Sequence, residues 1–255
     1  MATAKKTKIR EHMTLAEVLA ALEEAGTEQA RKTYRRHGAR EPVFGVSFAV
    51  LKTLAKRTGT DHELALALWD TGNFDARNLA VRIVEPGKMT LEQLDAWGRV
   101  GQIAMVMGYV ACVAVESPHR MVCGEAWLAD GDARVRAMGW QVVAALALQD
   151  ESLEDDWMSA QLQRIEQTIH TADNVERGPM NQALIAIGCR NAQLRELATA
   201  AAGRIGPVEI DHGDTACETV EAAPRIAKTW DHSLSKGHVS PAAHDRTRES
   251  MRTRC

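Results

Sequence analysis

Residues 14–38 read TLAEVLAALEEAGTEQARKTYRRHG, and the residue types in this stretch mark out one complete helix–turn–helix unit. Thr14 and Glu17 have the spacing of a capping box, in which each side chain bonds a backbone N–H at the start of a helix. Gly26 ends that helix, Thr27 opens the next one, and a second glycine closes it. Two helices joined by so short a link lie antiparallel. The stretch therefore predicts one antiparallel helix pair.

The same signals recur along the chain, and they predict helix pairs that begin at about residues 14, 47, 90, 132 and 179. Between them lie helical patterns with no strand-like alternation. Apolar residues make up 45% of the chain and aromatic residues only 4%, a composition that favours helix over sheet. A period of about 35–40 residues is typical of HEAT-like repeats. We therefore expect an all-α fold, a HEAT-like repeat solenoid of antiparallel helix pairs.

Composition shifts divide the chain into three parts. Residues 1–13 are basic and are expected to form a flexible N-terminal arm. Residues 14–232 are expected to form the helical repeat domain, with residues 205–232 as a C-terminal extension of it. Residues 233–255 are polar and basic with little apolar content, so we expect a loosely ordered tail.

The net charge of −3 is unevenly distributed. Residues 1–60 hold 12 Lys/Arg against 6 Asp/Glu (+6), residues 231–255 hold 5 against 3 (+2), and the rest holds 14 against 25 (−11). A protein that grips a phosphate backbone along its whole length would not have an acidic middle. Basic ends still allow local contact with nucleic acid.

The sequence contains no signal for a disulfide framework, a membrane span, a metal site or a nucleotide-binding loop. The chain has five cysteines without a CxxC pair, and reduced thiols in the cytoplasm are the simplest interpretation. No apolar run reaches the roughly 18 residues that a membrane span needs. The sequence has no HExxH motif and no glycine-rich phosphate loop after a strand. We therefore expect a cytoplasmic protein with no cofactor, no metal ion and no membrane partner.

Three segments, taken in order, resemble the DNA alkylation repair family of HEAT-like proteins over residues 14–205. The segments are Tyr34–His37 with Phe44–Ser47, Leu68–Asp70 with Phe74–Arg77, and Ser117–Pro118 with Ala126–Asp132. The resemblance implies an alkylpurine DNA N-glycosylase, or a non-catalytic relative that binds DNA on a concave helical face. Duplex DNA, held through backbone contacts, is the partner that it implies.

The sequence departs from the family at its catalytic position. In the family an Asp a few residues after a Trp stabilises the positive charge that forms as the glycosidic bond breaks. Here no Asp lies between Trp97 and Glu125. Alignment places Gln102 or Ile103 at the catalytic position, and spacing from Trp97 gives Gly101. The resemblance therefore implies a divergent member of the family, in which excision of alkylated bases would need a non-standard mechanism.

A cluster of basic residues in the second helix and just after it is the best candidate for binding phosphate. Its members are Arg31, Lys32, Arg35, Arg36 and Arg40. Arg31 and Arg35 are four residues apart, as are Lys32 and Arg36, so like charges lie side by side and favour an anionic partner. The alternative is a solvated basic face on a terminal helix.

A second group of polar residues, His170, Asn181, Asp211 and His212, offers weak catalytic candidates. They could line a cleft reused by a different enzyme. They could equally satisfy helix ends and turns. The acidic middle also allows another function, a non-catalytic HEAT-like module that binds a protein or a small molecule.

Overall fold

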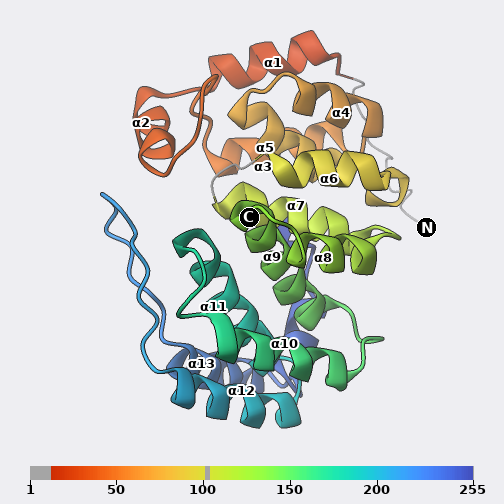
Figure 1. Ribbon diagram of the computed structural model, residues 1–255. Coiled ribbons are helices and arrows are strands. Elements are labelled where there is room, and N and C mark those ends of the chain that lie inside the picture. Colours follow the sequence, from red (N-terminus) through yellow and green to blue (C-terminus); the bar gives the residue numbers. More distant parts are fainter. Residues whose placement is uncertain (1–12, 101–103, 255) are drawn as a thin grey trace, which may run out of the picture. The chain divides into compact units, whose positions relative to one another are not determined.

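The structure is a computed structural model, and it describes residues 13–100 and 104–254. Within these ranges the chain forms fifteen α-helices and one 3₁₀ turn and contains no strand (Figure 1). The all-α prediction is confirmed. The chain divides into two compact units, one formed by residues 1–85 with 252–255 and the other by residues 86–251.

The first unit contains five helices before residue 86. They are α1 (Leu15–Glu24), α2 (Glu28–Arg36), α3 (Phe48–Thr58), α4 (His62–Asp70) and α5 (Phe74–Ile83). The predicted capping box of α1 is present, with Thr14 and Glu17 bonding each other's backbone N–H groups. Helix α5 is the centre of the unit, since every residue from Phe74 to Ile83 except Arg77 is buried. It packs against α1, α3 and α4.

The second unit contains the remaining elements. They are η1 (Pro86–Lys88), α6 (Leu91–Arg99), α7 (Ala104–Glu116), α8 (Arg120–Leu128), α9 (Ala133–Gln149), α10 (Asp155–Thr168), α11 (Asn174–Gly188), α12 (Ala192–Ile205), α13 (Ala222–Ser235), α14 (Pro241–Arg246) and α15 (Met251–Arg254). The last helix, α15, belongs to the first unit from Arg252 onward. Successive helices pack as four pairs, α6 with α7, α8 with α9, α10 with α11 and α12 with α13. Helices α7, α9, α11 and α13 also pack in sequence, each on the next, and form one layer. The predicted stack of helix pairs is therefore present in this unit.

Two predicted helix boundaries differ from the structure. The helix that begins at Ala133 is the second member of a pair rather than the first, because its apolar face packs on α8 before it and on α11. Pro179 does not open a helix but lies inside α11, which begins at Asn174. Pro179 is the sixth residue of α11, beyond the first turn, so its missing N–H removes one hydrogen bond of the helix.

The tail that we expected to be loosely ordered from residue 233 contains helices and buried residues instead. Ser240 caps α14, and the amide of Ala242, which is fully buried, donates to the carbonyl of Cys189 at 3.0 Å. Arg252 is buried in the first unit and donates to the carbonyl oxygens of Val81 and Arg82 at 2.9 and 3.0 Å. Small side chains and arginine–carbonyl bonds hold this segment, so its low apolar content was a poor guide to its order.

Candidate nucleic-acid interface

The five basic residues predicted to bind phosphate lie on α2 and in the segment that follows it, and they separate into two groups. Arg31 is half-buried and holds the fold. Its Nε donates to the carbonyl oxygen of Val43 at 3.1 Å, and its Nη2 donates to that of Phe44 at 3.2 Å. Its Nη1 lies 2.8 Å from a carboxylate oxygen of Glu28. Arg31 is therefore a structural residue of this unit.

Arg35 is also engaged, but at the surface. Its Nε and Nη2 both lie 2.6 Å from Oε1 of Glu41. The Arg35 guanidinium, with the amide of Val43, holds the pKa of the Glu41 carboxyl below its usual range. The arginine and the carboxylate are both largely exposed.

Lys32, Arg36 and Arg40 form the second group, which we call the open basic face. All three are exposed. Their side chains form no hydrogen bond or ion pair with another residue in the part of the chain that the structure describes. Lys32 and Arg36 are four residues apart on α2 and therefore neighbours on its surface. Three cations without a protein partner leave this face free to take an anion.

Arg40 lies in the link between α2 and α3. A buried carboxylate, that of Asp75 at the start of α5, holds this link in place. Asp75 accepts hydrogen bonds from the backbone amides of Phe44, Gly45 and Val46 at 2.7, 3.0 and 2.8 Å. Burial raises the pKa of the Asp75 carboxyl, while these three N–H donors act in the opposite direction. No sequence pattern indicates this role of Asp75, because an Asp in the first turn of a helix is ordinarily a surface residue.

Gly45 is required by the same segment. Its φ of +81° lies in the left-handed region, and a Cβ there would lie 2.5 Å from the carbonyl oxygen of Thr27. The amide of Thr27 donates to the carbonyl of Gly45 at 2.9 Å. The link between α2 and α3 thus packs tightly against the start of α2, and the open basic face rests on a rigid support.

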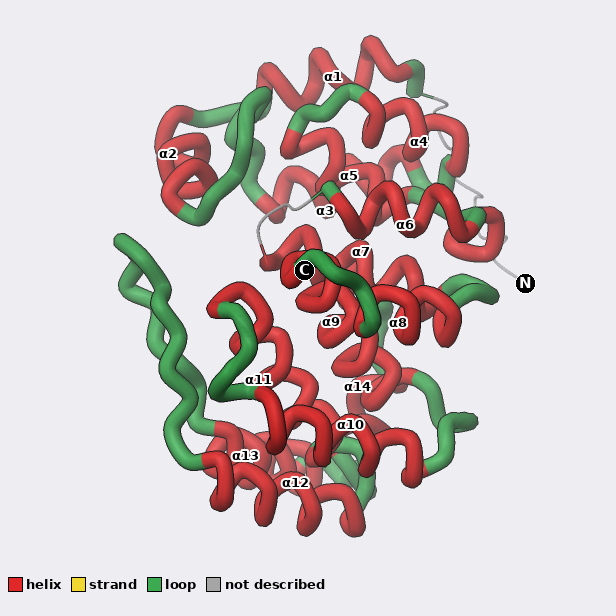
Figure 2. Tube along the Cα trace, viewed as in Figure 1, coloured by secondary structure: helices red, strands yellow, loops and turns green. Residues whose placement is uncertain are grey.

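The weak catalytic candidates lie in the second unit, around the segment 206–221 between α12 and α13. This segment, which we call the acidic arm, forms two extended runs side by side in Figure 2. It carries five Asp/Glu and no Lys or Arg. His212 bonds Thr219 across it at 3.0 Å.

Helix α11 and the residues before it hold this arm by its backbone. Nε2 of His170 lies 2.9 Å from the carbonyl oxygen of Ile205, and Nδ2 of Asn181 donates to that of Val220 at 2.7 Å. Arg177 donates to the carbonyl of Glu209 at 3.0 Å. Asn181 and Arg177 bind different parts of the arm and His170 binds the last residue of α12, so these side chains are not turned toward one reacting atom.

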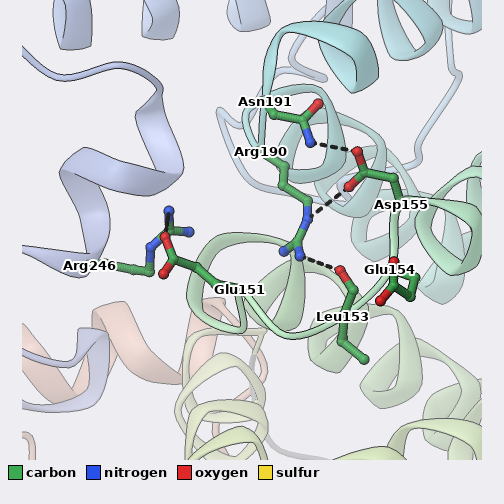
Figure 3. Close-up of a pocket in the computed structure, with 7 residues that line it drawn as sticks. All are labelled: Glu151, Leu153, Glu154, Asp155, Arg190, Asn191 and Arg246. Atoms are coloured by element: carbon green, nitrogen blue, oxygen red, sulfur yellow. Dashed lines mark hydrogen bonds and ion pairs between the residues drawn. The ribbon is translucent and has the colours of Figure 1, made fainter.

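A polar cavity of about 520 Å³ lies elsewhere in the second unit (Figure 3). It is lined by Glu151, Leu153, Glu154, Asp155, Arg190, Asn191 and Arg246. Arg190 is buried and donates to the carbonyls of Asp150 and Leu153 at 2.7 and 2.6 Å, and Asp155 pairs with it at 3.4 Å. Asp155 also accepts from Asn191 at 2.8 Å. This polar cluster holds the link between α9 and α10.

Other kinds of site are not formed by the described residues. No group of three or more His, Cys, Asp or Glu among them could hold a metal ion. No described helix has both the length and the apolar character that a membrane span requires. The family's catalytic position, aligned with Gln102 or Ile103 or by spacing with Gly101, lies outside the described residues, as do Lys5, Lys6, Lys8 and Arg10 of the N-terminal arm.

The family model described as DNA alkylation repair enzyme matches residues 18–213, which is most of the chain. The chain belongs to the DNA alkylation repair family. Two curated relatives, the uncharacterized proteins Lmo0209 of Listeria monocytogenes and Lin0241 of Listeria innocua, are each 28% identical over 204 residues, which cover 77% of this chain and 88% of the relative.

A solved structure is similar in fold and in sequence. It has a TM-score of 0.79 and 29% identity, and the match covers 89% of this chain and 96% of that one. It belongs to a family of proteins described as related to the HEAT-like repeat DNA glycosylases, with affinity for branched DNA structures. The HEAT-like repeat fold expected from the sequence is therefore confirmed for this member of the family.

Proposed function

We propose that this protein binds DNA, branched DNA above all, through contacts between the phosphate backbone and the open basic face. The observation that carries the proposal is the exposure of Lys32, Arg36 and Arg40 without a protein partner among the described residues. Unpaired cations on a rigid support gain by neutralising phosphates and releasing counterions. The affinity of the related solved structure for branched DNA supports the same class of partner.

The proposal is one of binding without base excision. The sequence from Trp97 to Glu125 contains no Asp that could stabilise the charge of a breaking glycosidic bond. Two polar groups that could replace it are engaged with backbone carbonyls, His170 with that of Ile205 at the end of α12 and Asn181 with that of Val220 in the acidic arm. Incubation with alkylated duplex should therefore release neither 3-methyladenine nor 7-methylguanine, whereas release of either base would require a mechanism that the proposal does not contain.

A titration of fluorescent DNA at several salt concentrations tests the binding. We expect a four-way junction to bind more tightly than a linear duplex of the same length. The triple variant Lys32→Ala/Arg36→Ala/Arg40→Ala should weaken binding to both and reduce the slope of log K against log salt by about 2.7, at about 0.9 per phosphate contact.

A matched variant removes three cations from the second unit. Arg225, Lys228 and Lys236 are exposed, and their side chains form no hydrogen bond or ion pair with another described residue. Their replacement by Ala changes the net charge equally and should leave the salt slope nearly unchanged. An equal loss in both triple variants would show that the contact surface lies elsewhere, and no binding to either DNA at low salt would end the proposal.

A further inference from the structure

The ion pair between Arg35 and Glu41 lies beside the open basic face. Each of its two side chains is exposed enough to bind another partner instead. Oε1 of Glu41 accepts from both Nε and Nη2 of Arg35 at 2.6 Å. The side chains are 47% and 58% exposed, so water and solutes reach both of them. Exposed ion pairs of this kind contribute little to stability and can be replaced by another partner.

Arg35 differs in this respect from its neighbour Arg31. The Arg31 guanidinium is bonded to two backbone carbonyls, those of Val43 and Phe44, and cannot leave them without loosening the link after α2. Among the residues that the structure describes, the Arg35 side chain forms no bond with the backbone; its partners are carboxylates, Glu41 and, at 4.0 Å, Glu28. Arg35 can therefore change partner while the fold stays as it is.

Glu41 is held in place independently of Arg35. Its second oxygen, Oε2, accepts a hydrogen bond from the backbone amide of Val43 at 2.9 Å. The carboxylate therefore remains next to the basic face when the guanidinium turns away. A guanidinium presents parallel N–H donors that suit the oxygens of a carboxylate and of a phosphate equally well.

We propose that Arg35 is a further phosphate subsite of the open basic face and that Glu41 occupies this subsite in the free protein. The inference rests on the proposed DNA binding. A backbone phosphate of DNA replaces the carboxylate on Arg35, and Lys32, Arg36 and Arg40 supply the neighbouring contacts. Glu41 thereby competes with DNA for Arg35 and lowers the affinity for DNA. This competition favours DNA that contacts several of these cations at once over DNA that contacts only one.

The substitution Glu41→Gln tests this directly. Glutamine keeps an oxygen that can accept from Val43 but loses the charge that holds Arg35. We expect binding of the four-way junction to become about three- to fivefold tighter, the range for release of an exposed ion pair. The salt slope should stay nearly the same, because Arg35 meets the same phosphate in the complexes of both proteins and only the competing carboxylate charge is lost. An unchanged thermal midpoint shows that the variant is folded.

A second pair of variants separates this subsite from a general effect of charge. In an Arg35→Ala background the gain from Glu41→Gln should fall below about twofold, because the subsite is gone. Glu24→Gln removes one exposed carboxylate that has no hydrogen bond or ion pair among the described residues, and it should change affinity little. A gain that persists without Arg35, or that Glu24→Gln reproduces, overturns the subsite.

The two proposals fail in different ways. Binding by the wild-type chain with no gain in Glu41→Gln overturns the subsite alone. Absence of binding by both proteins overturns the DNA-binding function together with the subsite.

Discussion

Asn174 holds the backbone of Asp211 by both of its polar groups. Nδ2 of Asn174 donates to the carbonyl oxygen of Asp211 at 2.9 Å, and Oδ1 of Asn174 accepts from the amide of Asp211 at 2.8 Å. A side-chain amide presents the same donor and acceptor as a peptide group. Asn174 therefore binds the Asp211 backbone in the way that a residue of a neighbouring strand would. Asn174 therefore fixes the backbone of the acidic arm at Asp211.

Replacement of Asn174 by Ala should loosen the acidic arm and leave the helices intact. Two hydrogen bonds are lost, and each contributes about 0.5–1.5 kcal/mol, so the local opening free energy should fall by about 1–3 kcal/mol. Hydrogen exchange of the Asp211 amide measures this. Gln182→Ala, at an exposed position of the same helix, is the control and should leave exchange in the arm unchanged. Unchanged exchange in Asn174→Ala would mean that other contacts carry the arm.

The chemistry of this region could be predicted from the sequence only in part. The sequence marks His170, Asn181 and Asp211 as polar residues outside the apolar helical pattern. Their partners could not be predicted, because a side chain that binds backbone carbonyls has the same sequence pattern as one that faces a substrate. The basic residues pose the same problem, since Arg31 and Arg36 are the same residue type in one helix, and only their positions relative to the link after α2 separate them.

The substitution Asp75→Asn should destabilise the first unit. The amide of an asparagine has only one oxygen for the three backbone N–H donors that Asp75 accepts, and its NH₂ group would face an N–H. A buried donor left unsatisfied costs about 1–3 kcal/mol, so we expect a loss of about 2–3 kcal/mol. Faster hydrogen exchange of the amides of Phe44 and Val46 would report it.

Asp70→Asn is the matched control for this variant, because Asp70 is exposed at the end of α4. Its substitution should change stability by no more than about 0.5 kcal/mol. Equal effects of the two variants would contradict a special role for the buried carboxylate.

Arg190→Ala should destabilise the second unit strongly. Arg190 is buried, pairs with Asp155 and donates to the carbonyls of Ala147, Asp150 and Leu153. Removal of one partner of a buried charged cluster costs about 3–5 kcal/mol. Chemical denaturation followed by circular dichroism measures the loss.

Arg204→Ala provides the comparison for Arg190→Ala. Arg204 is 60% exposed and pairs with Glu166 at 2.5 Å. Since exposed pairs contribute about 0–1 kcal/mol, its loss should cost no more than that. A similar cost for both arginines would show that burial of Arg190 adds nothing.

The helices themselves were largely predictable, and the way they pair was not. Capping residues such as Thr14, Asp61 and Asn191 are local signals, and each caps the helix that follows it. Pairing depends on which apolar faces meet across the unit. The helix from Ala133 is apolar on most of its surface, so its sequence does not show whether it pairs with α8 or with α10. In the structure it pairs with α8.

Three histidines at the C-terminal end of the second unit should make the docking of α14 dependent on pH. The ring of His244 stacks on that of His238 with centroids 4.2 Å apart, and the His232 ring lies 5.7 Å away. Partial burial and the neighbouring His238 and His232 lower the pKa of His244. The other groups that act on it are Arg248, which also lowers its pKa, Asp245, which raises it, and Ser233, whose hydroxyl lies 3.4 Å from its Nδ1.

Since the pKa of His244 is lower in the folded protein than in the unfolded chain, the unfolded chain binds the proton more tightly. The stability that the neutral ring contributes is therefore present above the ordinary histidine pKa of about 6.5, and it is lost as the pH falls from that value through the lower pKa of the folded protein. Hydrogen exchange of the Ala242 and Ala243 amides, corrected for intrinsic rates, should become faster between about pH 7.5 and pH 5.5. His238→Gln removes the stacked ring that lowers the pKa of His244 and should weaken this dependence, whereas His119→Gln, outside the cluster, should preserve it. A pH dependence that is the same in all three proteins would show that the stacked rings do not control the docking of α14.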